Sequence, residues 1–519
     1  MFAQLKPRQF VAFILTVIGV VTTSFFFYLN TIKGEAKIPE KINKNDTVSR
    51  APLRDTTSFE KLKFYIEDLC KNDSLARGSF SFCLMTADSG EIILEKNSRQ
   101  TLVPASVLKI VTTGTALAVL GKNFHFTTRL QYDGTIQNRI LSGNIYIKGG
   151  GDPSLGSPVF KGNDEESVMT NWVKAVQKLG IDTIDGAIIG DADIFDEDMI
   201  PAGYAWEDIQ SDYGVGTCGL SFRENLYDIE ISCGKNSTSC KIIPAIPDLR
   251  LTNKLVINKS EPKSYGYVSG SPYMNERTLL GVVNGNCMIQ SPIPDPAFFC
   301  ANDLKKYLNE AGIVVKDSAT TTRRLKNAGK FEKKERETFN TTCSPSLEVL
   351  VDHTNHVSQN FYAESILKAI SVNEYSYGTT SGGVNAVIKF WKEKGIDLRG
   401  FYMYDGNGVS RMNSVTAMQL ASMLRTYSRD AENFEPFYNS LPEVGESGTV
   451  RKIGQGTAAQ DNVRAKSGYM SRVRSYAGYV TDKKGRLLSF SMMANNYELG
   501  VVEMRGKFEK LMILMAELD

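Results

Sequence analysis

Three short motifs in this chain carry side chains suited to acyl transfer. They are S-x-x-K at 106–109, S-x-N at 358–360 and K-S-G at 466–468. Each motif is short enough to arise by chance in a chain of 519 residues. Their order along the chain and the chemistry that they share favour one common site.

The first motif predicts an activated serine nucleophile, Ser106. A serine hydroxyl is a poor nucleophile unless a neighbouring base takes its proton. A lysine three positions further along a helix lies on the same side as the serine, so Lys109 is the predicted base. Burial and a second cation, for example Lys466, would lower the pKa of this amine towards neutrality. A serine at a helix start also receives positive dipole potential, which favours an oxyanion. The alternative is a helix start with a solvated lysine, which the apolar surroundings disfavour.

The other two motifs supply groups for the proton path and for the substrate. Ser358 could relay a proton between the lysines and the leaving amine, and Asn360 could orient Lys109 and the substrate amide. The alternative for this motif is a helix N-cap, because Ser and Asn both favour that position. Lys466 and Ser467 on a strand edge could bind a substrate carboxylate, while the strand accepts an extended peptide. An ordinary edge lysine that discourages aggregation is the alternative there.

The surrounding sequence predicts the elements that position these motifs. Residues 104–120 are apolar or small on nearly every side, so their helix should be buried centrally. Residues 361–370 are amphipathic and predict a helix directly after S-x-N. Strands at 474–481 and 487–494 and a closing helix at 501–518 follow K-S-G.

The element order predicts a discontinuous domain with a long insertion. A helix near 59–69 and a hairpin at 79–94 would combine with the C-terminal hairpin, so that residues 58–126 and 340–519 form the catalytic domain. From about residue 127 the pattern changes to strands with Gly-rich turns, which predicts one or more inserted β-rich domains over 127–339. The basic residues of 323–336 are expected in an exposed loop.

The N-terminal segment predicts export. Lys6 and Arg8 precede an apolar run at 10–29, and a bilayer is crossed by about 20 such residues. Residues 1–32 are therefore a membrane anchor or a signal segment, and the polar residues 33–57 a linker. An uncleaved anchor is favoured over a cleaved signal peptide, since no small-x-small cleavage site ends the run. Either predicts a location in the periplasm or on the outer face of the cytoplasmic membrane.

Composition excludes several other classes of protein. The net charge of +2, from 60 basic and 58 acidic residues, indicates no nucleic-acid partner. Three histidines without an HExxH motif, and eight cysteines without a CxxC pair, argue against a metal site. An exported chain permits disulfides, with Cys233 and Cys240 closest in sequence, but buried free thiols are an equal alternative. No cofactor is predicted.

The three motifs together resemble those of penicillin-binding proteins and class A β-lactamases. Further segments resemble landmarks of the D-alanyl-D-alanine carboxypeptidase/endopeptidase family, the low-molecular-mass class C penicillin-binding proteins. These segments are 149–155 (GGGDPSL), 220–225 (LSFREN), 294–297 (PDPA) and 405–410 (DGNGVS). The resemblance covers about residues 55–519, and the long separation of Ser106 from Ser358 matches the insertion of that family.

The resemblance implies a fold and an activity. The fold would be the mixed α/β (α+β) penicillin-binding or serine β-lactamase-like transpeptidase fold, an antiparallel sheet flanked by helices, with inserted β-rich domains. The activity would be hydrolysis of D-Ala-D-Ala, or of D-alanyl cross-links, in peptidoglycan stem peptides through a Ser106 acyl-enzyme. β-Lactams would be covalent inhibitors.

The resemblance also implies residue roles. Ser106 would be acylated, Lys109 would be the base, and Ser358 and Asn360 would form the second motif. Lys466, Ser467 and Gly468 would bind the substrate carboxylate, and the amides of Ser106 and Tyr469 would form the oxyanion hole. Asp152 and Asp405 would be structural. Departures are Gln359 where Asp is common, Ser467 where Thr is common, and the bulky Tyr469.

Two other functions remain open at this point. A β-lactamase or esterase would use the same nucleophile, although the insertion disfavours it and no carboxylate is placed to assist deacylation. A catalytically silent wall-binding scaffold would be expected to lack a motif residue, and none is missing.

Overall fold

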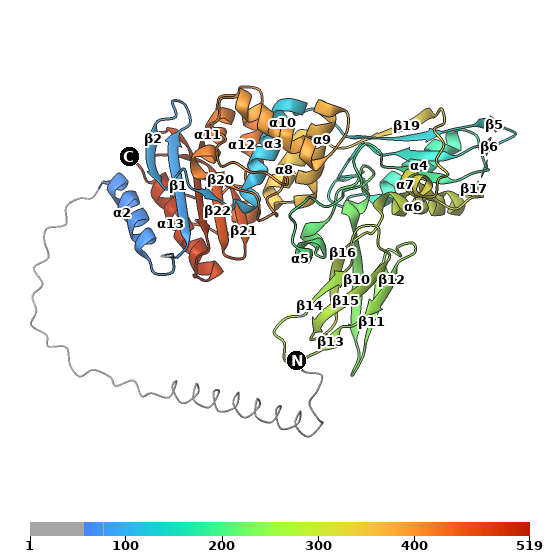
Figure 1. Cartoon of the computed structure of the whole chain (residues 1–519), viewed down its shortest axis with the longest axis horizontal. Helices are drawn as coiled ribbons and strands as arrows, with labels where there is room; N and C mark the ends of the chain where they lie inside the picture. Colours follow the sequence, from blue (N-terminus) through green and yellow to red (C-terminus); the bar gives the residue numbers. More distant parts are fainter. Residues whose placement is uncertain (1–56, 76) are drawn as a thin grey trace, which may run out of the picture. The chain divides into compact units, whose positions relative to one another are not determined.

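The computed structural model of the chain describes residues 57–75 and 77–519 (Figure 1). The predicted anchor or signal segment, and all of the predicted linker except Thr57, lie outside these residues. Across the described part of the chain, no helix combines the length and the apolar character needed to cross a bilayer.

An antiparallel five-stranded sheet joins the two ends of the described chain. Its strand order is β2-β1-β23-β22-β21. β1 therefore pairs with β23, a strand from the far end of the sequence. The bounds are β1 Ser79–Thr86, β2 Ile92–Lys96, β21 Arg464–Met470, β22 Val473–Thr481 and β23 Leu487–Asn495. β21 forms one edge of this sheet.

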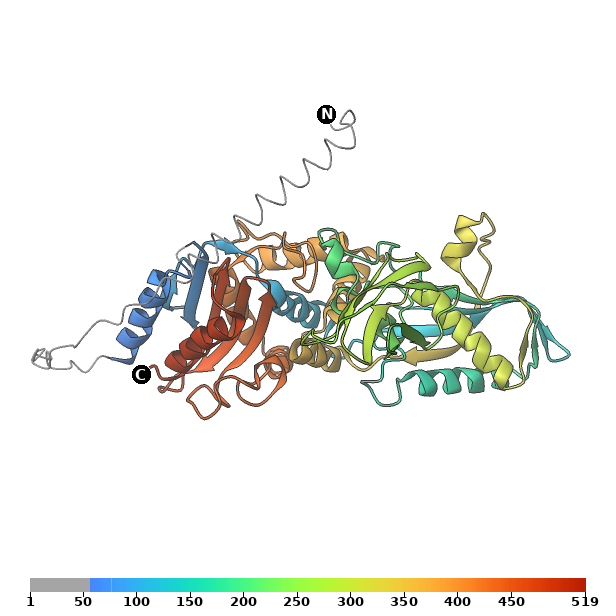
Figure 2. The same cartoon turned by 90° about the horizontal axis from the view of Figure 1, so that it is seen from below.

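Helices cover both faces of this sheet. On β1, Phe82 and Leu84 pack in the cluster that includes α2 and α13, whereas Cys83 and Met85 pack with the other helices. This alternation is the period of two expected for a strand buried on both faces. Figures 1 and 2 show α2 and α13 together on one side of the sheet. Their bounds are α2 Ser58–Lys71 and α13 Val501–Ala516.

The second layer is a group of helices around α3. As predicted, α3 is buried centrally, since all of its first nine residues are buried. Gly121, at φ 82°, ends the helix. The bounds are η1 Ala105–Leu108, α3 Lys109–Leu120, α8 Leu347–Val357, α9 Asn360–Tyr375, α10 Thr380–Glu393, α11 Ala417–Ser428 and α12 Phe434–Ser440. The short strands β3 (Thr101–Leu102) and β20 (Val415–Thr416) pair beside them. This arrangement confirms the predicted fold class.

The long insertion leaves and rejoins the helical layer through two paired strands, β4 (Thr127–Tyr132) and β19 (Glu337–Cys343), with Thr127 opposite Cys343. The predicted boundary after residue 339 falls inside β19, and the division into domains stays a prediction. β4 and β19 belong to the sheet β18-β9-β7-β4-β19, beside the sheet β17-β8-β6-β5. The other strands are β5 Thr135–Gln137, β6 Ile140–Ser142, β7 Ile145–Lys148, β8 Thr183–Ile184, β9 Ile188–Asp191, β17 Val314–Val315 and β18 Thr320–Thr321. Helices α4 (Glu165–Lys178) and α6 (Pro296–Glu310) contribute to the same core.

Two further small sheets complete the insertion, β11-β10-β16 and β12-β15-β13 with β14 beside β15. The bounds are β10 Leu226–Cys233, β11 Thr238–Ile243, β12 Arg250–Asn253, β13 Val256–Ile257, β14 Tyr265–Ser269, β15 Glu276–Val283 and β16 Cys287–Pro292. Cys233 and Cys240 lie in this part unbonded, and all eight cysteines are free thiols.

The basic segment 323–336 is not entirely a loop, contrary to the prediction. Residues Thr322–Asn327 form the short helix α7. Arg323 and Arg324 both contact the carboxylate of Asp295, at 2.8 and 3.4 Å. The sequence pattern did not predict these ion pairs, because Asp295 precedes the arginines by nearly thirty residues and a helix separates them along the chain.

Candidate active site

Ser106 stands in the one-turn helix η1, which leads directly into α3. Val107 and Leu108, the two residues that follow Ser106 in this turn, are fully buried. Their burial fixes the turn in the core and leaves the partly exposed Ser106 at the helix start. Ala105 takes a positive φ of 50°, which is uncommon for a residue with a Cβ.

Lys109 is fully buried, and its amine has three oxygen neighbours. Nζ lies 3.0 Å from Ser106 Oγ, 2.6 Å from Asn360 Oδ1 and 2.8 Å from the backbone oxygen of Asn407. The two asparagine oxygens can only accept hydrogen bonds. A neutral amine would donate its two N–H groups to them and direct its lone pair at the Ser106 hydroxyl.

The side chain of Asn360 is oriented by a second contact. Its Nδ2 donates to the backbone oxygen of Tyr213, in the insertion, at 2.8 Å. The Oδ1 atom must therefore face Lys109. The first and second motifs thus meet directly, as the sequence predicted for a single site.

Ser358 lies at the junction of α8 and α9. It ends α8 in the left-handed conformation, at φ 63° and ψ 40°. Gln359, not Ser358, is the N-cap of α9, and it makes no capping hydrogen bond through its side chain. The N-cap alternative is therefore wrong for Ser358. Within residues 57–75 and 77–519 its hydroxyl makes no hydrogen bond with either lysine; it lines a cavity of about 290 Å³ together with Tyr213 and Asn360.

The third motif lies on the edge strand β21, next to η1. Lys466 is fully buried, and its Nζ donates to the backbone oxygen of Ser467 at 3.0 Å. The hydroxyl of Ser467, in the middle of this strand, donates to Thr449 Oγ1 at 2.7 Å. Burial, and then the charge of Lys109, lower the pKa of Lys466 well below its usual value.

Gly468 brings β21 against the backbone of the nucleophile. A Cβ at this position would lie 3.0 Å from the amide nitrogen of Ser106 and 2.7 Å from the oxygen of Pro104. Only glycine permits this approach. The next residue, Tyr469, is 51% exposed, and the Arg474 guanidinium lies 4.7 Å from its ring centroid.

The comparisons with known proteins agree with this geometry. Residues 62–517 match the model of the D-Ala-D-Ala carboxypeptidase 3 (S13) family. This chain belongs to that family. It is therefore a serine peptidase that hydrolyses D-Ala-D-Ala bonds.

Relatives of this carboxypeptidase family match most of the chain. The D-alanyl-D-alanine carboxypeptidase DacB of Haemophilus influenzae is 23% identical over 82% of this chain and 87% of its own. A D-alanyl-D-alanine carboxypeptidase of an Actinomadura species is 24% identical over 84% of this chain and 81% of its own. The crystal structure of penicillin binding protein 4 (dacB) from H. influenzae has a TM-score of 0.74 at 21% identity, and covers 86% of this chain and 97% of that chain. The same protein complexed with a β-lactam has a TM-score of 0.69 at 19% identity, with the same coverage.

Two buried carboxyl groups lie behind the lysine of this carboxypeptidase. Asp405 accepts hydrogen bonds from the amides of Gly408 and Ser410 and from the Asn413 side chain, so it shapes the loop that carries Asn407. Glu364 accepts from the amide of Gly406, while its other oxygen has no hydrogen-bond partner in the part of the chain that the structure describes. Burial, and then the charge of Asp405, raise the pKa of Glu364, so Glu364 is the one of the pair that we expect to be protonated.

Sequence reasoning missed several residues of this site. Asn407 lies in the landmark segment 405–410, in which only Asp405 was given a role, and Glu364 follows S-x-N by four positions. Tyr204 and Tyr213 come from the insertion, where no pattern distinguishes them. Thr449 also went unnoticed. Asp152, which the resemblance marked as structural, is buried and accepts from the amide and hydroxyl of Ser154.

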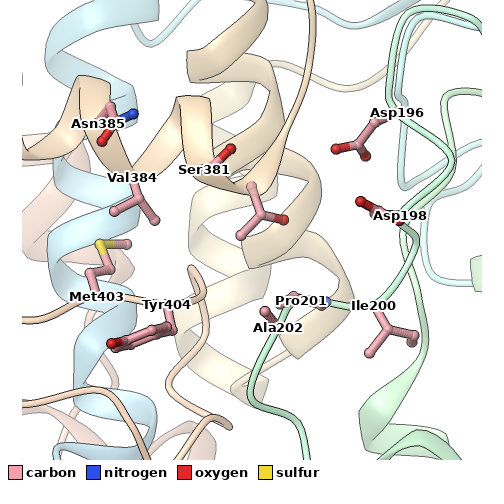
Figure 3. Close-up of a pocket in the computed structure, with 11 residues that line it drawn as sticks. Asp196, Asp198, Ile200, Pro201, Ala202, Ser381, Val384, Asn385, Met403 and Tyr404 are labelled. Carbon is pink, nitrogen blue, oxygen red and sulfur yellow. The ribbon is translucent and has the colours of Figure 1, made fainter.

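A larger cavity of about 460 Å³ lies elsewhere, between α10 and residues 196–202 of the insertion. Figure 3 shows Ser381, Val384 and Asn385 of α10 on one side and Asp196 and Asp198 on the other. None of the motif residues lines it. Nor do the described residues contain three His, Cys, Asp or Glu side chains grouped as metal ligands.

Acylation is expected to increase as the pH rises through about 7. Burial lowers the pKa of Lys109 to about 7, against the opposing effect of Asp405 and Glu364. Below that pH the ammonium form has three N–H donors and no lone pair, so it cannot accept the serine proton; above it the neutral amine can. The check is the second-order rate constant for acylation by a fluorescent penicillin across about pH 5–9. A constant unchanged over this range would contradict Lys109 as the base.

Proposed function

We propose that Ser106 is the nucleophile of this D-Ala-D-Ala carboxypeptidase and that neutral Lys109 is its general base. Ser106 Oγ attacks the carbonyl carbon of the penultimate D-alanine while its proton passes to Lys109 Nζ. The peptide C–N bond then breaks, and the leaving amine of the terminal D-alanine takes that proton. The observation that supports this most directly is the surroundings of the Lys109 amine, which can donate two N–H groups to the asparagine oxygens and direct its lone pair towards Ser106 Oγ.

The third motif supplies the binding groups in this proposal. The buried amine of Lys466 and the hydroxyls of Ser467 and Thr449 bind the terminal carboxylate of the substrate, whose negative charge favours the protonated form of that amine. The substrate extends along β21, the edge strand, whose outer side pairs with residues 442–443 at Arg464 and Ala465 but with no named strand among the described residues. The amides of Ser106 and Tyr469 stabilise the oxyanion, and the tight approach of Gly468 sets their separation.

Water completes the proposed cycle by hydrolysing the Ser106 ester, which returns the proton to the serine. Ser358, beside Asn360, relays protons to the leaving amine once the substrate is bound. β-Lactams enter the same cycle, because attack by Ser106 opens their ring and leaves an ester that hydrolyses slowly. The β-lactam complex of the H. influenzae relative supports this part of the proposal.

The proposed substrates are the stem peptides of peptidoglycan, which places the catalytic domain outside the cytoplasm. The apolar run at 10–29 would export the chain and would anchor it if it remains uncleaved. D-alanyl cross-links are proposed substrates as well, since an endopeptidase differs only in the amine that leaves.

The test combines a covalent probe with product analysis. Wild-type protein incubated with a fluorescent penicillin is expected to gain the mass of one penicillin, and Ser106→Ala is expected to gain none. Chromatography of muropeptides should show loss of terminal D-alanine, or of cross-links, with the wild type only. Covalent labelling of Ser106→Ala would show that Ser106 is not the nucleophile.

A further inference from the structure

A short segment of the insertion reaches the catalytic lysine through two asparagines. The bracing segment, residues 204–214, includes α5 (Trp206–Ile209) and η2 (Asp212–Gly214). At one end, Tyr204 Oη accepts a hydrogen bond from Asn407 Nδ2. At the other end, the backbone oxygen of Tyr213 accepts from Asn360 Nδ2 at 2.8 Å. These two asparagines also hold Lys109.

We propose that the bracing segment is a positioning element of the active site. It orients Asn360 and Asn407 so that both accept from Lys109 and the amine lone pair is directed at Ser106. This inference rests on the proposed function of Ser106 and Lys109. It gives part of the insertion a role in acylation, although the insertion contributes none of the three motifs.

The asparagine contacts leave little freedom for another arrangement. Asn407 Oδ1 accepts from the amide of Val409 at 2.8 Å, so its Nδ2 can face only Tyr204. The neighbouring residue Gly406 is held on both sides, by Glu364 at its amide and by Thr112 Oγ1 at its oxygen, at 2.6 Å. Among the described residues, the hydrogen bond to Tyr204 is the one by which a side chain of the insertion holds the loop that carries Asn407.

Asp208 closes the bracing segment on itself. Its carboxylate accepts from the amide of Ala205 at 3.1 Å and from Tyr213 Oη at 3.0 Å. Its backbone oxygen accepts from Ser211 Oγ at 2.6 Å, and a Cβ at Gly214 would lie 1.7 Å from that oxygen. One side chain therefore connects the start of the segment, near Tyr204, with its end at Tyr213.

Separate contacts attach the insertion to α9. Lys368 Nζ donates to Asp196 Oδ1 at 2.6 Å and to the oxygen of Asp198 at 2.9 Å. Tyr362 Oη donates to Glu224 at 2.8 Å. These bonds do not involve the bracing segment, so substitutions within the segment are expected to leave the insertion attached to α9.

The test separates binding from acylation with Tyr204→Phe and Asp208→Ala. Stopped-flow kinetics with a fluorescent penicillin would give the dissociation constant of the first complex and the acylation rate constant at saturation. Each variant is expected to lower the rate constant by about tenfold, the effect of one lost hydrogen bond, and to change the dissociation constant by less than about twofold. Tyr402→Phe is the matched control, because Tyr402 is exposed and its hydroxyl makes no hydrogen bond among the described residues.

Rescue distinguishes positioning from simple loss of structure. Asp208→Asn keeps a carbonyl acceptor and is expected to recover most of the rate that Asp208→Ala loses, with Tm measured for every variant. If Tyr204→Phe and Asp208→Ala were both acylated at the wild-type rate, the inference about the bracing segment would be overturned and the proposed function would stand. A wild type that is not acylated, or a Ser106→Ala that is, would instead overturn the proposed function.

Discussion

Lys109→Met is expected to lower the acylation rate constant by about 10³-fold or more, within the range for loss of a positioned general base. Methionine fills similar space in the buried site but cannot accept the proton of Ser106. Lys109→Arg is expected to lose as much, because a guanidinium keeps its charge and cannot act as a base near neutral pH. The measurement is the rate of labelling by a fluorescent penicillin at a fixed pH above 7.

A matched substitution controls for loss of a lysine elsewhere. Lys330 is exposed, so Lys330→Met is expected to label at the wild-type rate. Circular dichroism and Tm establish that Lys109→Met is folded, which is expected because Glu364 behind it can remain protonated. Labelling of folded Lys109→Met within tenfold of the wild type would exclude Lys109 as the base.

Gly468→Ala is expected to lower acylation by about 10² to 10³-fold, the effect of losing an oxyanion donor. The added Cβ would lie 2.2 Å from Ser475 Oγ as well as 3.0 Å from the amide nitrogen of Ser106. Because this space is already filled, β21 is expected to move away from η1. That movement would displace the amides of Ser106 and Tyr469, which are proposed to bind the oxyanion. The check is again the acylation rate constant, together with the rate of D-alanine release from a D-Ala-D-Ala peptide.

A glycine in open space is the control for this prediction. Gly506 lies on α13, and a Cβ there would meet nothing within 4 Å. Gly506→Ala is expected to acylate normally and to gain about 0.5–1 kcal/mol of stability from helix propensity. If Gly468→Ala acylated as fast as Gly506→Ala, the close approach of β21 to Ser106 would have no catalytic role.

The sequence predicted the parts of the site that depend on local spacing. Ser106 and Lys109 are one helical turn apart, and Asn360 begins a helix, so each could be recognised within a few residues. The burial of Lys109 also followed from local sequence, because its helix is apolar on nearly every side. Gly468 was recognised as part of a motif, but its need for close contact with Ser106 appears only when the strand and the turn are seen together.

Contacts between distant segments could not be predicted in this way. Tyr204 and Tyr213 act through one hydroxyl and one backbone oxygen, in a segment with no periodicity. Ser358 takes its left-handed conformation at the junction of α8 and α9, and a serine at that position does not signal such a conformation. The partners of Asp295 were missed for the same reason.

The pairing of β1 with β23 has a consequence for how this protein is made. Val103, near the first strands, bonds to the Asn495 side chain 392 positions further on. During synthesis or translocation from the N-terminus, apolar β1 therefore has no partner on one side until nearly the whole chain has emerged. Contacts between such distant positions form slowly, and unpaired strands invite aggregation. The catalytic domain is thus expected to depend on protection of this nascent edge, whereas the insertion can fold earlier on contacts of its own.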